Sequence, residues 1–157
     1  MEFISLYEKF KSREVHKLSG VIILIEDRIL LVSPKKFKGQ KNKWSIPKGH
    51  VEGNVLKSAL HELREETGIK IHKNFESKLK AKYRKNGVDK KLTAYLYRLN
   101  KEDIQKYLKG WDIKKSRFDR DEIYEAKFFK LDKAYNKIED QQRVLIDELT
   151  THLEESN

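Results

Sequence analysis

The sequence predicts an α/β fold with a mixed β-sheet lying between α-helices, and the order of its patterns is the reason. Two β-rich runs, residues 19–25 and 29–33, flank a short polar turn and indicate a hairpin. An amphipathic helix is expected next, then a second pair of strands, and finally another amphipathic helix. Strands and helices in this order are typical of a sheet covered by helices on its faces.

The first helix has recognisable boundaries. Residues 34–42 are expected to form a basic loop and residues 44–46 a short strand that leads toward the helix. Asn54 is a good N-cap residue, because its side chain can accept a hydrogen bond from a backbone N–H of the first turn. Gly68 is a good C-terminal stop, because glycine adopts the left-handed conformation that ends many helices. The helix is therefore predicted to lie between Asn54 and Gly68.

A second hairpin follows the helix. Asn86 and Gly87 are typical of a two-residue turn, since both residues readily adopt positive φ. The flanking segments, residues 77–84 and 91–99, are rich in residues that favour strands. The sequence therefore predicts a hairpin over these two segments.

Two helices and a late strand complete the predicted fold. Asn100, with Asp103 at the third position, begins a predicted helix over residues 101–108 that Gly110 stops. Residues 125–131 are predicted to form a strand. The C-terminal helix is indicated by apolar residues at helical spacing: Ile138, Leu145, Leu149 and Leu153.

Length and composition narrow the class of protein. The 157 residues are expected to form a single domain, residues 1–157, with a substantial core. The chain has no cysteine, which excludes disulfides, zinc–thiolate sites and cysteine nucleophiles. No signal peptide is evident, and no stretch approaches the ~20 apolar residues of a membrane helix. We therefore expect a cytoplasmic protein without a membrane partner.

The chain is strongly basic. Its 35 Lys and Arg residues against 25 Asp and Glu residues give a formal net charge of +10. This charge favours polyanionic partners such as nucleotides, RNA ends or inositol polyphosphates. The alternative is a general richness in lysine without a specific partner. Local density favours a specific role, because a group of lysines precedes the acidic helix: Lys35, Lys36, Lys38, Lys41, Lys43 and Lys48.

Three glutamates share one face of the first predicted helix. At ~100° per residue, Glu62 and Glu66 lie ~40° apart, and Glu65 lies ~60° to the other side of Glu62. Like charges on one face repel, which favours a bound cation, and oxygen ligands select Mg²⁺ or Mn²⁺. The alternative is an acidic face that is only solvated. A second face is expected to enter the core, and it carries Leu56, Leu60 and Leu63.

Two short motifs surround these glutamates. Residues 44–52 read Trp-Ser-Ile-Pro-Lys-Gly-His-Val-Glu, and residues 59–69 read Ala-Leu-His-Glu-Leu-Arg-Glu-Glu-Thr-Gly-Ile. The second motif resembles the box of the Nudix hydrolase family, Arg-Glu-apolar-x-Glu-Glu-x-Gly-apolar. The first resembles the Pro-Lys-Gly-His-x-Glu variant of the dinucleoside polyphosphate hydrolases. The resemblance covers roughly residues 17–153 and implies the Nudix fold, a sheet sandwiched by helices.

The chain also departs from the family pattern. Between Gly49 and Gly68 it is two residues shorter than the family's box. Asn54 stands where the family has its first box glutamate. His61 stands where the family has an arginine that braces neighbouring carboxylates, and a neutral imidazole lacks that fixed bidentate charge. We interpret the site as active but atypical, with an inactive nucleotide-binding module as the alternative.

The resemblance implies a metal-dependent pyrophosphohydrolase in which water attacks a diphosphate linkage. It assigns the metal, Mg²⁺ or Mn²⁺, to Glu62, Glu65, Glu66 and the backbone carbonyl of Lys48. One of the three glutamates would orient the water or accept its proton, and the sequence does not say which. In many members a further acid arrives from a loop near the last strand. Glu122 is the first candidate for that acid and Glu125 the second.

The first motif indicates dinucleoside polyphosphates as substrates, with RNA 5′ ends as the runner-up, because both present a base followed by a phosphate chain. A plain basic nucleic-acid-binding protein is a third reading. Tyr83 is the candidate for stacking a base, whereas Tyr95 and Tyr97 share a strand face and are expected in the core. Neither His50 nor His61 is expected to bind Mg²⁺. Substrate phosphates are expected to contact lysines: Lys36, Lys38, Lys43 and Lys48.

Overall fold

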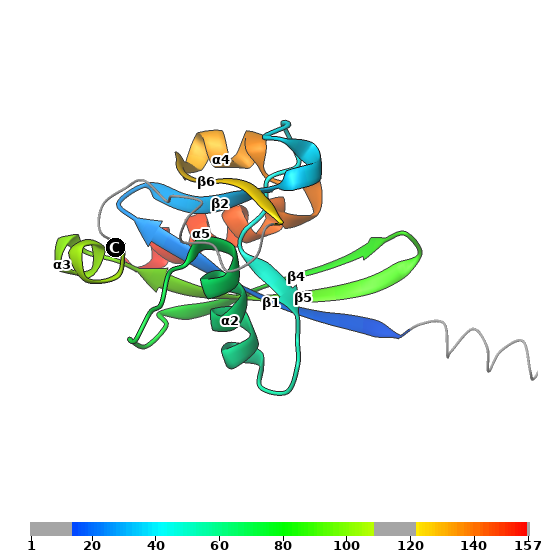
Figure 1. The fold of residues 1–157 in the computed structure, drawn as a ribbon, viewed down its shortest axis with the longest axis horizontal. Helices are drawn as coiled ribbons and strands as arrows, with labels where there is room; N and C mark the ends of the chain where they lie inside the picture. The colour runs from blue at the N-terminus through cyan, green and yellow to red at the C-terminus, as the bar shows by residue number, and fades with distance from the viewer. Residues whose placement is uncertain (1–13, 109–121, 157) are drawn as a thin grey trace, which may run out of the picture.

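The computed structural model describes residues 14–108 and 122–156. Within these residues one mixed sheet has the strand order β4-β5-β1-β2-β6, and β3 pairs with β1 off this path. Figure 1 shows α2 on one face of the sheet and α5 behind the other. The predicted α/β fold, a mixed sheet between helices, is confirmed. The strands are β1 (Val15–Ile25), β2 (Arg28–Pro34), β3 (Lys48–His50), β4 (Ser77–Lys85), β5 (Val88–Arg98) and β6 (Ile123–Lys130), and the α-helices are α2 (Val55–Thr67), α3 (Lys101–Asp103), α4 (Leu131–Lys137) and α5 (Arg143–Glu155).

Both predicted hairpins are confirmed. β1 and β2 are antiparallel, with Leu24 opposite Ile29 at the turn. β4 and β5 are antiparallel around Asn86 and Gly87, which have φ of 54° and 76°. Positive φ at both central residues gives the turn a twist that matches the flanking strands.

Strand β1 is longer than its sequence pattern predicts. It begins at Val15, and residues 15–17 are exposed, so no apolar alternation identifies them. These residues are strand because β1 pairs in parallel with β5 from Val15 opposite Asp89 to Leu24 opposite Arg98. Pairing between strands far apart in sequence therefore sets this boundary.

The predicted boundaries of the first helix are confirmed at both ends. The side chain of Asn54 accepts a hydrogen bond of 2.9 Å from the backbone N–H of Lys57. Gly68 ends the helix with φ of 77°, and its N–H donates to the carbonyl of Arg64. Both signals are local, which is why the sequence contains them.

The short strand before this helix lies later than predicted. Residues 44–46 make only isolated bridges, between Ser45 and Val32 and between Trp44 and Ile138. The strand itself is β3, which pairs antiparallel with residues 18–20 of β1. A Cβ on Gly20 would lie 2.5 Å from the carbonyl oxygen of Pro47 and 2.9 Å from Cβ of Lys48. The absence of a side chain at Gly20 therefore allows β3 to pack this closely.

The second half departs from prediction at two helices. The helix after Asn100 has the expected capping box, but α3 ends at Asp103 and a π-helical turn continues over Ile104–Leu108. Gly110 lies outside the described residues. Helix α4 was not predicted, and Ile138 lies after it rather than within α5. Ile138 is nevertheless fully buried, so its apolar character identified a core position and not a helix.

Two apolar clusters fill the faces of the sheet. α4 and α5 pack on the cluster that contains Leu18 and Trp44, whereas α2 packs on the cluster that contains Tyr95 and Tyr97. Tyr95 and Tyr97 are 4% and 1% exposed, which confirms their predicted core role. No helix among the described residues is both long and apolar enough to span a membrane.

Candidate active site

Helix α2 and strand β3 lie in close contact at Glu62 and Gly49. A Cβ on Gly49 would overlap the carboxyl carbon of Glu62 and lie 2.5 Å from its Oε1. Glu62 is itself only 9% exposed. The backbone of Gly49 therefore forms one wall of the space that holds this carboxylate, and any larger residue would displace it.

The backbone of Lys48 contacts a second glutamate of α2. Its N–H donates a 3.0 Å hydrogen bond to Oε2 of Glu66. Within a strand, the N–H and C=O of one residue point to the same edge. The carbonyl of Lys48 therefore faces the edge of β3 at which Glu66 lies, which agrees with its expected role as a metal ligand.

Glu66 has the most perturbed acidity of the described residues near this edge. It is 7% exposed, and burial raises the pKa of its carboxyl well above the usual value. The neighbouring charge of Glu62 raises this pKa further, the charge and the backbone N–H of Lys48 oppose the rise, and the charge of Glu122 adds the smallest increase. Such a group holds its negative charge readily only when a cation lies beside it.

A pocket beside Glu66 brings acidic and basic residues together. Its lining includes Glu66, Glu122, Lys35 and Lys36. The backbone N–H of Lys35 donates to the carbonyl of Glu122 over 2.8 Å, which joins the basic loop to the segment before β6. A phosphate chain in this pocket would therefore lie near both lysines and carboxylates.

The other predicted lysines lie in different surroundings. The ammonium group of Lys43 lies 5.1 Å from the ring centre of Phe37, outside the lining of this pocket. Lys38 adopts φ of 46° at the end of a 3₁₀ turn and is also absent from the lining. Of the basic loop, the structure therefore brings Lys35 and Lys36 to the acidic centre, and Lys35 had not been singled out as a substrate contact.

Glu65 lies on a different side of the helix from Glu66. Its Oε1 is 2.8 Å from Nε2 of His61, one helical turn earlier. His61 thus contacts a carboxylate of the box from the position at which the family has its bracing arginine. Of the three glutamates, Glu66 thus accepts a hydrogen bond from β3, whereas Glu65 lies beside His61.

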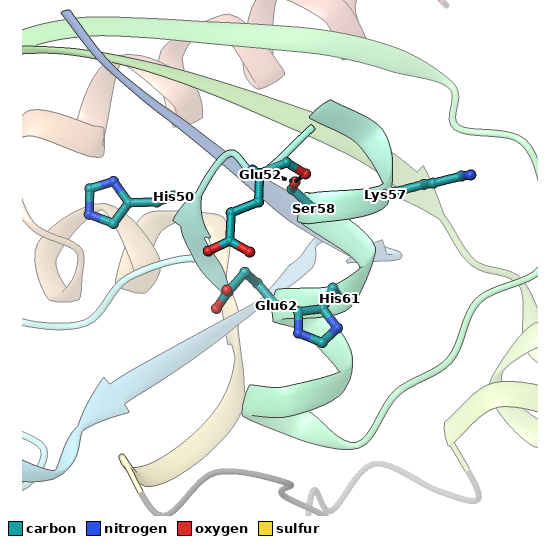
Figure 2. A pocket seen from close by; sticks show the side chains of 6 residues that line it. All are labelled: His50, Glu52, Lys57, Ser58, His61 and Glu62. Carbon is teal, nitrogen blue, oxygen red and sulfur yellow. Dashed lines mark hydrogen bonds between the residues drawn. The ribbon is translucent and has the colours of Figure 1, made fainter. Parts of the chain in front are cut away.

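A second pocket lies at the N-terminal half of α2 (Figure 2). Figure 2 shows the carboxylates of Glu52 and Glu62 facing the same space, with the imidazole of His61 nearby. The hydroxyl of Ser58 donates to the carbonyl of Glu52 over 3.0 Å and accepts from its N–H over 2.9 Å. These two bonds close the shortened loop between β3 and α2.

The side chain of Lys48 lies on the opposite face of the sheet from α2. Lys48 pairs with Gly20, and even-numbered residues of β1 such as Leu18 and Ile22 belong to the cluster under α5. Burial lowers the pKa of Lys48, and the charges of Glu139 and Glu66 oppose this. Burial raises the pKa of Tyr83, and Glu139 contributes to this shift as well. Tyr83 and Lys48 therefore both lie near Glu139, although Tyr83 is distant in sequence from the box.

Two further residues complete the description of the site. Glu125, the second candidate for the additional acid, pairs instead with Lys127 at 3.0 Å. Gln142 is fully buried and accepts a 3.1 Å hydrogen bond from the N–H of Ile46, while its amide donates to Ser45. It fixes the segment that leads into β3. No sequence signal pointed to Gln142, because its role depends on contact between residues 96 positions apart.

The chemistry of the donor set fits a hard divalent cation. Glu62, Glu66 and Glu122 supply carboxylate oxygens, and the carbonyl of Lys48 faces the same edge of β3. Among residues 14–108 and 122–156, no three His, Asp or Glu side chains are already grouped in a geometry that holds a metal. A bound cation would therefore have to draw the carboxylates inward from their present contacts.

The chain belongs to the Nudix family: residues 16–149 match the model described as NUDIX domain. No curated protein sequence is significantly similar to the chain. Solved structures with the same fold include the Ap4A hydrolase of C. elegans as a binary complex, with 19% identity, 88% of this chain and 97% of that chain covered, and a TM-score of 0.61. The MutT protein of Methanosarcina mazei Go1 has 15% identity, 89% and 96% coverage, and a TM-score of 0.65. A NUDIX hydrolase of Nitrosomonas europaea has 17% identity, 87% and 90% coverage, and a TM-score of 0.61.

Proposed function

We propose that this protein is a divalent-metal-dependent hydrolase that cleaves a diphosphate linkage in a nucleoside polyphosphate. The observation that carries the proposal is the pair of buried carboxylates on α2, with Glu62 held against Gly49 and Glu66 bound to the N–H of Lys48. Burying carboxylates without enough positive charge beside them destabilises the folded protein. Buried acids of this kind are therefore typical of functional sites. Membership of the Nudix family supports the same chemistry.

The metal would be held by Glu62, Glu65, Glu66 and Glu122 with the carbonyl of Lys48. When bound, Mg²⁺ or Mn²⁺ neutralises phosphate charge and lowers the pKa of bound water. Lys35 and Lys36 line the pocket that contains Glu66 and Glu122, and they would bind the phosphates farther from the acids. Gly49 and Gln142 keep β3 in the position that this arrangement requires.

A dinucleoside polyphosphate is the substrate that we favour. The Pro-Lys-Gly-His-x-Glu motif supports it, and so does the likeness of fold to the C. elegans Ap4A hydrolase. Tyr83 would stack a base, since its ring is only partly buried beside Lys48 and Glu139. The strongly basic surface favours the second candidate, a pyrophosphohydrolase of RNA 5′ ends.

A substrate panel tests the proposal. The protein is incubated with dinucleoside tetraphosphate, nucleoside triphosphate and 5′-triphosphate RNA in Mg²⁺ or Mn²⁺, and the products are identified by mass spectrometry. We expect the fastest turnover with the dinucleoside tetraphosphate and none in excess chelator. Binding of these ligands without any product would support the non-catalytic module instead.

A further inference from the structure

Strands β1, β4 and β5 project beyond α2 (Figure 1). Three lysines form a row across these paired strands. In the pairing register, Lys17 lies opposite Lys91, and Lys91 lies opposite Lys82. Directly paired residues point to the same face of a sheet, so the three side chains share one face. We call Lys17, Lys82 and Lys91 the lysine row.

The charge of the lysine row is not balanced locally. Neighbouring strands lie only ~4.8 Å apart, and like charges directly opposite each other destabilise a sheet. Across residues 14–108 and 122–156, no ion pair joins the row to a carboxylate. Asp89, two residues from Lys91 and in the lining of the same hollow, pairs with Arg84 at 3.0 Å. A bound anion would offset this repulsion.

The row lines a hollow that is separate from the acidic centre. The hollow has a volume of about 600 Å³, and its lining includes Val15 and Arg84 beside the row. It shares no lining residue with the pocket of Glu66 and Glu122. Val15 is 49% exposed, which adds an apolar contact next to the three charges.

We propose that the lysine row binds the sugar–phosphate backbone of a single-stranded nucleic acid. A line of cations matches a chain of repeating phosphates better than it matches one compact anion. Val15 and the alkyl stems of the lysines offer apolar surface to unstacked bases, which a duplex does not present. The proposal goes beyond diphosphate hydrolysis, because the row shares no residue with the acidic centre. Tyr83, proposed above to stack a base of the substrate, also lines the hollow, and none of the substitutions in the test below changes it.

The test measures binding without catalysis. A 5′-hydroxyl oligoribonucleotide labelled at its 3′ end is titrated with the protein in EDTA at several salt concentrations, and fluorescence anisotropy is recorded. The probe offers no terminal phosphate and EDTA removes divalent cations, so the acidic centre does not contribute. The variant is Lys17→Gln/Lys82→Gln/Lys91→Gln, and the charge-matched control is Lys127→Gln/Lys130→Gln/Lys133→Gln on β6 and α4.

We expect the row variant to bind at least about tenfold more weakly at low salt, with the slope of log K against log salt reduced by about 2 in magnitude, since each lost phosphate contact contributes about 0.7. The control should change the slope by less than half as much. Equal losses in both variants would overturn the proposal, because the charge would then act globally. Binding of inorganic polyphosphate to the row, with no binding of the oligonucleotide, would also overturn it.

A thermal measurement confirms that the row variant is folded and reports the repulsion directly. At low salt and without nucleic acid, removing three adjacent like charges should raise the melting temperature of the row variant above that of the control. Lys91→Arg retains the charge and should retain binding within about twofold of the wild type. Loss of binding in Lys91→Arg as large as in the triple variant would contradict a role based on charge.

Discussion

Two regions of this protein concentrate like charge, and they do so in opposite environments. On α2, Glu62 and Glu66 are only 9% and 7% exposed and lie against the backbone of β3. In the lysine row, Lys17 and Lys82 are exposed to solvent. Water and salt weaken interactions between exposed charges but weaken those between buried charges much less. We therefore expect the buried acids to bind one cation at a defined place, and the row to bind through the summed effect of several contacts.

The largest effect is expected from the box glutamates. Glu65→Gln and Glu66→Gln should each lower kcat by at least ~10²-fold, because each removes a charged ligand and leaves the size of the side chain unchanged. Steady-state kinetics with the best substrate of the panel measures this. Far-UV circular dichroism checks that the fold is intact. Turnover near the wild-type rate in both variants would place the active site elsewhere.

Gly49→Ala tests the close approach of β3 and α2. The added methyl group would overlap the carboxyl group of Glu62, so we expect a loss of about 1–3 kcal/mol in the free energy of unfolding and at least ~10-fold in kcat. Urea denaturation measures the first and kinetics the second. The double variant Gly49→Ala/Glu62→Ala relieves the overlap and should regain stability without activity. Full activity in Gly49→Ala would show that Glu62 does not need its present position.

The basic loop is expected to have a smaller effect, on substrate affinity. Replacing Lys36, Lys38 and Lys43 together by Gln should raise KM roughly tenfold, since each exposed contact contributes up to ~1 kcal/mol. The effect should shrink as salt rises. Because only Lys36 of the three lines the pocket, Lys36→Gln alone should account for most of it. A similar KM change in Lys127→Gln/Lys130→Gln/Lys133→Gln would mean that the charge acts globally.

The smallest predicted effect concerns pH and stability without metal. The pKa of Glu66 is raised above its usual value of 4.5, so the folded protein holds this proton more tightly than the unfolded chain. Its contribution to stability is therefore fully present below pH 4.5 and is lost as pH rises through the folded pKa. Glu66→Gln removes this loss, and in EDTA at neutral pH it should melt a few degrees higher, on the order of 2–5 °C. Thermal unfolding from pH 4 to 8 measures the difference in melting temperature between the variant and the wild type. Equal melting temperatures at every pH would show that Glu66 is not a charged, buried group.

The sequence predicts the parts of this molecule that depend on neighbouring residues. Asn54 and Gly68 bound α2 as expected, and Asn86 and Gly87 form the expected turn, because caps and turns are local interactions. Helical spacing predicts that Glu62, Glu65 and Glu66 share a face, and the metal site built from them stays a prediction. Leu56 and Leu60, however, are only half-buried, and Glu62 and Glu66 are more deeply buried than either.

The features that the sequence could not predict depend on contacts between distant segments. The burial of Glu62 follows from the position of Gly49 on β3, and the lysine row follows from the register of three strands. Neither contact leaves a periodic pattern along the chain. Lys48 is a further example, because the sequence does not show that its backbone and side chain face different groups. Its backbone faces Glu66, whereas its side chain lies toward Glu139 on the other face of the sheet.

The central claim is that the buried acids of α2 form a divalent cation site, and Mn²⁺ binding tests it most directly. Electron paramagnetic resonance of free Mn²⁺ is followed during titration of wild-type protein, of Glu66→Gln and of the variant Lys17→Gln/Lys82→Gln/Lys91→Gln. We predict saturable binding to the wild type, at least about tenfold weaker binding to Glu66→Gln, and little change when the lysine row is removed. Equal Mn²⁺ affinity in the wild type and Glu66→Gln would contradict the account.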